Sequence, residues 1–188
     1  IQLTMSDLIG SYSIVLLHND DIYAFRDPLG IKPLCLGKIE DGYVVASESS
    51  PIEIMGGEFI RDVEPGEIVK ITTDEITSES ISHSKKRAFC MFEYVYFARP
   101  DAKIDGVLTY SVRQRIGKTL WEEAPVDADV VVPVPDSGIA GALGFSEQSK
   151  IPYREGLIKN RYVHRSFIQP GNEQRKSTIN EKLNPVKE

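Results

Sequence analysis

A stretch of positive charge between residues 154 and 176 is the part of this sequence best suited to chemistry. Its six basic residues outweigh two acidic ones, so its local net charge is +4 although the whole chain carries −6. The basic residues are Arg154, Lys159, Arg161, Arg165, Arg175 and Lys176. Guanidinium and ammonium groups grip phosphate oxygens, and Gly156 and Pro170 allow the backbone to bend. The pattern predicts a loop that closes over a polyanion.

The same stretch has two other interpretations. Charged runs often form a solvated surface or a crossover helix that binds nothing. A nucleic-acid patch is the third interpretation, but no recognisable DNA- or RNA-binding module accompanies the charge.

A second candidate is the turn that follows the apolar run 130–134. Such a run is typical of a parallel strand that is buried on both faces. Asp136, Ser137 and Gly138 then lie at the carboxyl edge of the sheet, where open α/β folds place ligands. Ser137 could reach a metal-bound phosphate, and the helix expected after Gly138 favours anions. Alternatively, Asp136 or Ser137 only caps that helix.

The segment 25–34 is dense in turn residues and contains the adjacent pair Arg26 and Asp27. The pair could bind a substrate, but such pairs more often fasten a turn. The histidines His18, His83 and His164 show no spacing typical of a metal site or a catalytic triad.

The elements that position these residues change in character along the chain. The first half predicts strands at residues 12–17, 22–25, 34–39, 43–46, 67–71, 76–81 and 91–98, with a short helix from 49 through 55. The second half predicts helices at 111–123 and 138–148 around the strand 130–134. Strand–helix alternation indicates a parallel sheet, so we expect a domain boundary near residue 100.

Composition narrows the function classes. The chain has 188 residues, 41% of them hydrophobic, a net charge of −6 and a pI near 5.2. An acidic chain is a poor partner for nucleic acid or an anionic membrane. No apolar run is long enough to span a bilayer and we see no signal peptide, so we expect a cytoplasmic protein. The two cysteines, Cys35 and Cys90, predict reduced thiols rather than a disulfide framework.

Five segments, taken in order, resemble the glutamine phosphoribosylpyrophosphate amidotransferases. They are RDPLGIKPL at 26–34, FEYVYFARPD at 92–101, VPVPDS at 132–137, LIKNRYVHRSFIQP at 157–170 and KLNP at 182–185. The first resembles glutamine amidotransferase domains of class II in general. The resemblance covers essentially the whole chain, and the order of the segments is more specific than any one of them.

The resemblance implies an α/β and α+β protein with two partial domains. Residues 1–100 would be the later part of an antiparallel αββα glutaminase domain of the N-terminal-nucleophile type. Residues 101–188 would begin a parallel-sheet phosphoribosyltransferase domain. The implied activity is that of a glycosyltransferase, the glutamine-dependent formation of 5-phosphoribosylamine from phosphoribosylpyrophosphate, which is the first committed step of purine (IMP) biosynthesis.

The resemblance also implies roles for single residues. Ser137 would be a Mg²⁺ ligand, and Arg26 and Asp27 would be structural supports. Cys90 stands where some members supply a [4Fe-4S] ligand and others have a cysteine without a cluster, and both readings stay open. The substrate-binding loop would contain Lys159, Asn160, Arg161, Tyr162 and Arg165. Glutamine and phosphoribosylpyrophosphate would be substrates, purine nucleotides inhibitors, and the protein a homo-oligomer.

The sequence also departs from the family's pattern. Position 1 is not the nucleophilic cysteine, and the paired-aspartate motif is not among these residues, so we expect an internal segment without a catalytic residue of its own. His164 and Ser166 stand where glycine and threonine are typical. A second hypothesis is therefore a catalytically inactive, truncated paralogue that regulates by binding a nucleotide or a partner. A glucosamine-phosphate synthase type of amidotransferase is a third, against which the second half argues.

Overall fold

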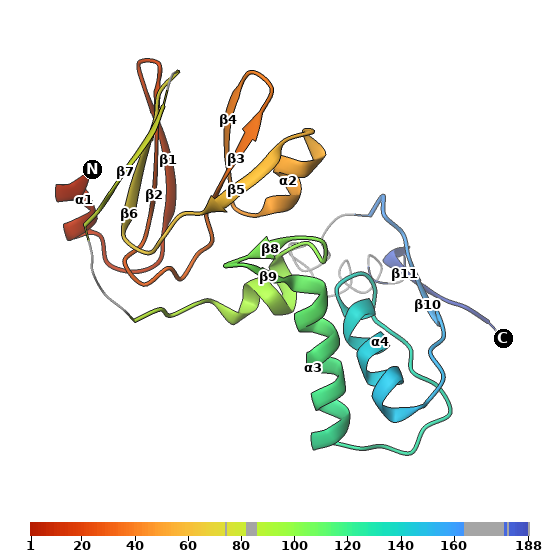
Figure 1. The fold of residues 1–188 in the computed structure, drawn as a ribbon. Helices are drawn as coiled ribbons and strands as arrows, with labels where there is room; N and C mark the ends of the chain where they lie inside the picture. Colours follow the sequence, from red (N-terminus) through yellow and green to blue (C-terminus); the bar gives the residue numbers. More distant parts are fainter. Residues whose placement is uncertain (74, 82–85, 164–178, 180, 188) are drawn as a thin grey trace. The chain divides into compact units, whose positions relative to one another are not determined.

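The computed structural model describes residues 1–73, 75–81, 86–163, 179 and 181–187. The chain divides into two compact units, Ile1–Thr109 and Tyr110–Glu188 (Figure 1). Each unit has its own secondary structure. The boundary near residue 100 that we expect between the two domains of the family stays a prediction.

The first unit contains an antiparallel four-stranded sheet. Its order is β1-β2-β6-β7, formed by β1 (Ser13–His18), β2 (Asp21–Arg26), β6 (Glu67–Ile71) and β7 (Ile76–Ser80). Successive side chains of a strand point to opposite faces. On β2, Ala24 packs in a cluster with Val69, while Phe25 packs in another with Ile68 and Met5 of helix α1 (Gln2–Asp7). Both faces of the inner strands are therefore covered.

A second antiparallel sheet, of order β4-β3-β5, completes the core of this unit. It contains β3 (Cys35–Ile39), β4 (Gly42–Ala46) and β5 (Glu58–Asp62). Helix α2 (Ser49–Ile54) buries Ile52 completely. Gly37 makes this packing possible, because a Cβ there would lie 2.3 Å from Ile52 Cγ2.

The prediction of a strand at 91–98 is wrong. Residues Glu93–Phe97 form a π-helical turn, η1. Aromatic and β-branched residues favour strands only where they pack on a pleated surface. Here tertiary contacts decide instead, since Glu93 accepts a hydrogen bond from Lys32 and the Tyr94 hydroxyl donates one to the Ile104 carbonyl.

A two-residue hairpin follows η1 in the first unit. Strands β8 (Lys103–Ile104) and β9 (Val107–Leu108) are joined by Asp105 and Gly106, with φ values of +45° and +76°. Two consecutive positive φ angles are typical of the tight turn that suits strand twist, and Asp-Gly favours it. The hairpin fixes the position of the Asp105 side chain.

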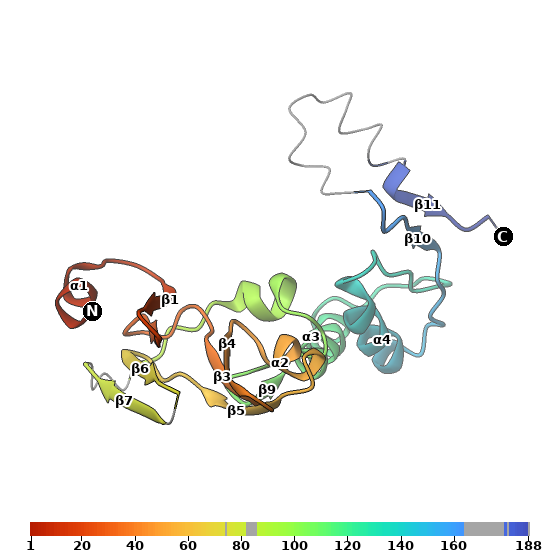
Figure 2. The same ribbon diagram turned by 90° about the horizontal axis from the view of Figure 1, so that it is seen from above.

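The described part of the second unit includes helices α3 and α4 and an antiparallel pair of short strands. The elements are α3 (Thr109–Glu123), whose first residue closes the first unit, α4 (Gly138–Ser149), β10 (Leu157–Lys159) and β11 (Leu183–Pro185). Helices α3 and α4 lie side by side in both views (Figures 1 and 2). Their backbones touch at glycines, because a Cβ on Gly144 would lie 2.0 Å from the Gln114 carbonyl oxygen.

Within the described residues, all paired strands are antiparallel and the predicted strand at 130–134 is reduced to one bridge. Val131 pairs in parallel with Tyr153, through hydrogen bonds of 2.9 Å to the Pro152 carbonyl and 3.0 Å from the Arg154 amide. The structure thus has antiparallel sheets in a mixed α/β chain, and the larger parallel sheet stays a prediction. In the part of the chain that is described, no helix has the length and apolar character needed to cross a membrane.

Candidate functional site

The start of α4 carries the hydroxyl and the carboxylate that the sequence singled out. Ser137 is the residue before the helix, with φ −64° and ψ −27°, and its side chain makes no capping hydrogen bond to α4. Asp136 precedes it and is exposed. The hydroxyl is therefore not engaged in capping, which was the competing interpretation for Ser137.

Lys159 reaches this turn from the end of β10. Its Nζ donates a hydrogen bond to Asp136 Oδ2, and the two side chains are 28% and 49% exposed. The backbone of β10 is held by antiparallel pairing with β11, where Lys159 lies opposite Leu183. The structure thus brings together the turn and the first basic residue of the predicted loop, which are 23 residues apart in sequence.

The next loop residues turn away from the strand. The Asn160 amide donates to the Lys182 carbonyl at 2.8 Å, and the Asn160 side-chain oxygen accepts from the Tyr162 amide at 3.0 Å. Arg161 is exposed, and Tyr162 is 95% exposed. Arg165, like His164 and Ser166, lies outside the described residues.

This arrangement is suited to an anion that brings a metal ion with it. The positive end of the 12-residue helix α4 and the Lys159 ammonium attract phosphate oxygens. The Ser137 hydroxyl is a hard oxygen donor of the kind that Mg²⁺ prefers. The described residues contain no group of three or more His, Cys, Asp or Glu side chains that could hold a metal. A Mg²⁺ ion fits here as one held by few protein oxygens and by substrate phosphates.

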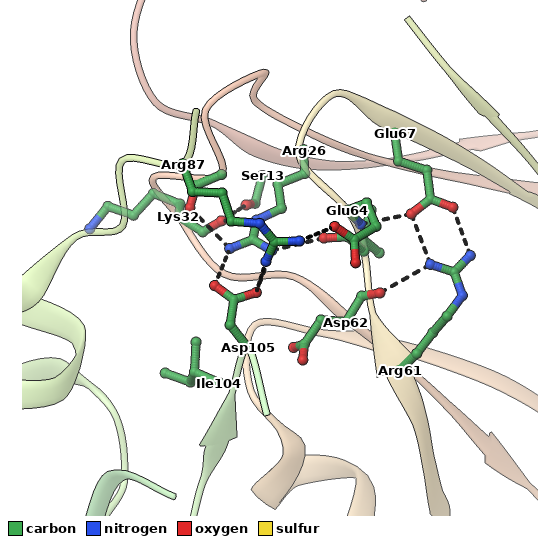
Figure 3. A network of polar contacts seen from close by, with 12 residues as sticks. Ser13, Arg26, Lys32, Arg61, Asp62, Glu64, Glu67, Arg87, Ile104 and Asp105 are labelled. Carbon is green, nitrogen blue, oxygen red and sulfur yellow. Dashed lines mark hydrogen bonds and ion pairs between the residues drawn. The ribbon is translucent and has the colours of Figure 1, made fainter. Parts of the chain in front are cut away.

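Arg26 is buried in the first unit, and Figure 3 shows its polar neighbours. It is 1% exposed, and its Nε donates to the Lys32 carbonyl at 2.6 Å. Its two terminal nitrogens donate to the Val63 and Gly30 carbonyls at 2.8 and 3.0 Å. Both also bind the Asp105 carboxylate, at 3.0 and 3.2 Å. These contacts use the whole donor set of a guanidinium group, so none is left for a substrate.

The Asp27 carboxylate holds the backbone of the turn that follows Arg26. Its carboxylate is 0% exposed and accepts hydrogen bonds from the backbone amides of Leu29, Ile31 and Lys32, at 3.0 to 3.3 Å. This geometry favours the interpretation in which Arg26 and Asp27 stabilise a turn over the one in which they bind a substrate.

Asp105 is the partner of Arg26 that sequence reasoning missed. Its sequence signal is the Asp105-Gly106 dipeptide between the β-branched residues Ile104 and Val107, which predicts a tight hairpin. Burial, and then the nearby Asp105 charge, raise the pKa of the Asp62 carboxyl, although the Asp105 and Gly106 amides oppose the shift. The Asp105 carboxylate therefore affects the ionisation of Asp62 as well as binding Arg26.

Arg61 and Glu67 form a second pair beside it (Figure 3). Two hydrogen bonds of 2.8 and 2.7 Å join them, and the Glu67 side chain is 7% exposed. Burial acts to raise the pKa of Glu67, but the Arg61 bonds and the Glu64 amide together hold that pKa below its usual value.

Cys90 lies beside a lysine rather than beside other thiols. Lys32 Nζ is 3.9 Å from Cys90 Sγ and 2.8 Å from Glu93 Oε1, and the Glu93 bond raises the pKa of Lys32. Cys35 is buried, and burial raises its pKa to about 12. A [4Fe-4S] cluster requires four ligands, usually thiolates. The described residues provide only two thiols, Cys35 and Cys90, and Cys35 is buried.

Comparison with known proteins extends over both units. Residues 1–53 match the family described as glutamine amidotransferase domain. The chain is 52% identical to the amidophosphoribosyltransferase of Archaeoglobus fulgidus over 96% of its own length and 40% of the relative's. It is 49% identical to that of Methanocaldococcus jannaschii, over 98% of the chain and 42% of the relative.

Solved structures agree with the sequence matches. The B. subtilis glutamine phosphoribosylpyrophosphate amidotransferase complexed with ADP and GMP is 43% identical, with a TM-score of 0.87 over 98% of this chain and 41% of that one. A structure described as the allosteric regulatory enzyme of purine biosynthesis matches equally well, with a TM-score of 0.87. The chain spans about two fifths of the length of these relatives, and over that span its sequence and fold match those of the amidophosphoribosyltransferases.

Proposed function

We propose that the protein carrying this chain is an amidophosphoribosyltransferase. It would convert glutamine, water and phosphoribosylpyrophosphate to 5-phosphoribosylamine, glutamate and pyrophosphate, at the start of purine biosynthesis. The observation that carries the proposal is the similarity to one enzyme across both units, with a TM-score of 0.87 over 98% of the chain. An amidotransferase of the glucosamine-phosphate synthase type would share only the first half.

The finer domain assignment belongs to the same proposal. Residues 1–100 would form part of an αββα glutaminase domain, and residues 101–188 part of a parallel-sheet phosphoribosyltransferase domain. The match of residues 1–53 to a glutamine amidotransferase domain supports the first assignment. The parallel bridge at Val131, followed by the turn and α4, supports the second.

In this function the start of α4 would receive the pyrophosphate group of the substrate. Ser137 would offer an oxygen donor to a Mg²⁺ ion, which would neutralise charge on the leaving pyrophosphate. Lys159 would place its ammonium against a phosphate oxygen, where a charge-assisted hydrogen bond strengthens as negative charge develops. Arg161 and Tyr162, which are exposed next to Lys159, would complete the substrate-binding loop with Asn160 and Arg165.

Arg26 and Asp27 would act only through the shape of the first unit. Their polar atoms are engaged with backbone groups and with Asp105, so they position the 26–32 turn rather than bind glutamine. Cys90 would be a ligand of a [4Fe-4S] cluster if the rest of the protein supplies the other thiolates. The iron content of the purified protein tests this role of Cys90.

The relatives also suggest how the protein would be regulated and assembled. The B. subtilis structure was determined with ADP and GMP, and another is described as an allosteric regulatory enzyme. We extend the proposal to inhibition by purine nucleotides, to a homo-oligomeric state and to a cytoplasmic location.

The test is an activity assay on the whole protein with glutamine, phosphoribosylpyrophosphate and Mg²⁺. We expect the protein to release pyrophosphate. Lys159→Ala and Arg161→Ala should each slow this release, through a loss of about 1.5–3 kcal/mol of transition-state stabilisation. The rate of glutamine hydrolysis should fall less in both variants. Lys118→Ala is the matched control, because Lys118 is an exposed lysine paired with Glu147 on the helices of the same unit. Absence of pyrophosphate release, or equal loss of both activities, would contradict the proposal.

A further inference from the structure

The carboxylate of Asp136 occupies a place that suits a phosphate oxygen. It lies in the turn just before α4 and accepts the hydrogen bond of Lys159 Nζ. The amino end of a helix and a lysine ammonium together form an environment that favours an anion. The anion that Lys159 contacts is the protein's own carboxylate.

Asp136 and a bound phosphate group would compete for the same ammonium. A carboxylate and a phosphate both accept charge-assisted hydrogen bonds, and the phosphate carries more charge and more acceptor atoms. The Asp136–Lys159 pair is substantially exposed, at 49% and 28%. Exposed ion pairs contribute little free energy, so an incoming polyanion can displace this one.

The backbone around Lys159 lets the exchange occur without a large rearrangement. Lys159 is fixed at the end of β10 by its pairing with Leu183, and the next amide, of Asn160, is bound to the Lys182 carbonyl. Only the flexible side chain of Lys159 has to move between one acceptor and the other.

We propose that Asp136 is a positioning residue that acts as an internal competitor of the substrate for Lys159. It holds the ammonium at the start of α4 while the site is empty, yields it to a phosphate oxygen on binding, and takes it back as pyrophosphate leaves. This inference rests on the proposed function, because it takes pyrophosphate as the leaving group. It assigns to Asp136 the role of easing product release rather than of binding the substrate.

The test is a double-mutant cycle on pyrophosphate binding, measured by calorimetry with Mg²⁺ on the whole protein. The variants are Asp136→Asn, Lys159→Met and the double variant. Asp136→Asn should tighten pyrophosphate binding by about two- to fivefold, the range that an exposed ion pair supports. Most of that gain should disappear in the Lys159→Met background. In kinetics, inhibition by pyrophosphate should strengthen by the same factor while the KM for glutamine stays unchanged.

Two further variants separate a specific exchange from a general effect of charge. Glu147→Gln breaks the Lys118–Glu147 pair, which has a 2.9 Å separation and similar exposure in the same unit, and should leave pyrophosphate binding unchanged. Asp136→Glu should restore the parent affinity. Near-identical effects of Asp136→Asn in both backgrounds, or weaker binding by Asp136→Asn, would overturn the inference and leave the proposed function standing. A parent protein that binds no pyrophosphate would overturn both.

Discussion

At the scale of single residues, the contact between Arg26 and Asp105 balances a buried positive charge. Arg26 is 1% exposed, and its charge is balanced by a carboxylate that is 19% exposed. Removing one partner from a buried pair leaves the other charged and without compensation, which costs more than the pair itself contributes. The two residues are 79 positions apart, so the pair joins the 26–32 turn to the β8–β9 hairpin.

Asp105→Asn should therefore destabilise the protein strongly. We expect a loss of about 3–5 kcal/mol in the free energy of unfolding, because the amide keeps the shape of the side chain but not its charge. Urea unfolding followed by circular dichroism measures this change. Glu64→Gln is the control, since Glu64 pairs with Arg87 at 59% and 54% exposure and should cost no more than about 1 kcal/mol. Similar losses for the two variants would contradict the account of Arg26.

Glu67 should make stability depend on pH in the acidic range. Its pKa is lowered in the folded protein, so it binds protons more readily when unfolded, and its contribution is present above the ordinary value of about 4.3. That contribution is lost as pH falls through the lowered folded value. Asp62, whose pKa is raised, acts in the opposite direction.

Glu67→Gln should accordingly cost about 1.5–3 kcal/mol of stability at pH 7, the usual range for hydrogen bonds to a charged group. The difference from the parent protein should narrow steadily below about pH 4. Unfolding curves at pH 7, 5 and 3 measure it. A difference that stays constant over this range would show that the Glu67 charge is not what stabilises the Arg61 contact.

At the scale of elements, local sequence signals predicted most of the described strands and the helices α3 and α4. The Ser49-Ser50-Pro51 run predicted α2, and the spacing of Val112, Ile116 and Leu120 predicted α3. These predictions are confirmed. The apolar spacing did not identify the packed face of α3, because Ile116 and Leu120 remain 40% and 52% exposed while Gly117 faces α4.

The elements that were missed or wrong depend on distant partners. Strand β5 has the polar sequence Glu58–Asp62 and pairs only because β3 offers its edge. The π-helical turn Glu93–Phe97 has a strand-like sequence, but contacts with Lys32 and Ile104 fix it. The sequence singled out Ser137 and Lys159, whose roles stay predictions, but it did not single out Asp105 of the first unit, because its partner Arg26 lies 79 residues away.

The close approach of α3 and α4 leads to a prediction for this pair of helices. A Cβ on Gly144 would lie 2.0 Å from the Gln114 carbonyl oxygen, whereas one on Gly141 would meet nothing closer than 3.7 Å. Gly144→Ala should push the helices apart and cost at least about 1–3 kcal/mol. Gly141→Ala, in the same helix, should be neutral or stabilise by up to about 1 kcal/mol through helix propensity.

Thermal unfolding of the two variants measures the difference. The order of the melting temperatures, with Gly144→Ala below the parent protein and Gly141→Ala at or above it, is the expected result. The reverse order would mean that the two helices do not pack through their glycines.

At the scale of the whole molecule, the two units carry different parts of one proposed reaction. The first contains a buried network around Arg26 that supports a glutaminase-like fold, and the second presents Lys159 and Ser137 at the start of α4. Similarity to one enzyme over 98% of the chain links the two units to a single function. Coupling of glutamine hydrolysis to transfer is therefore the central claim.

The measurement that tests this claim most directly is the ratio of glutamate to pyrophosphate released by the whole protein with glutamine, phosphoribosylpyrophosphate and Mg²⁺. We expect equal amounts of the two products, with glutamate release that depends on phosphoribosylpyrophosphate. Glutamate released without pyrophosphate, or neither product from a folded protein, would contradict it.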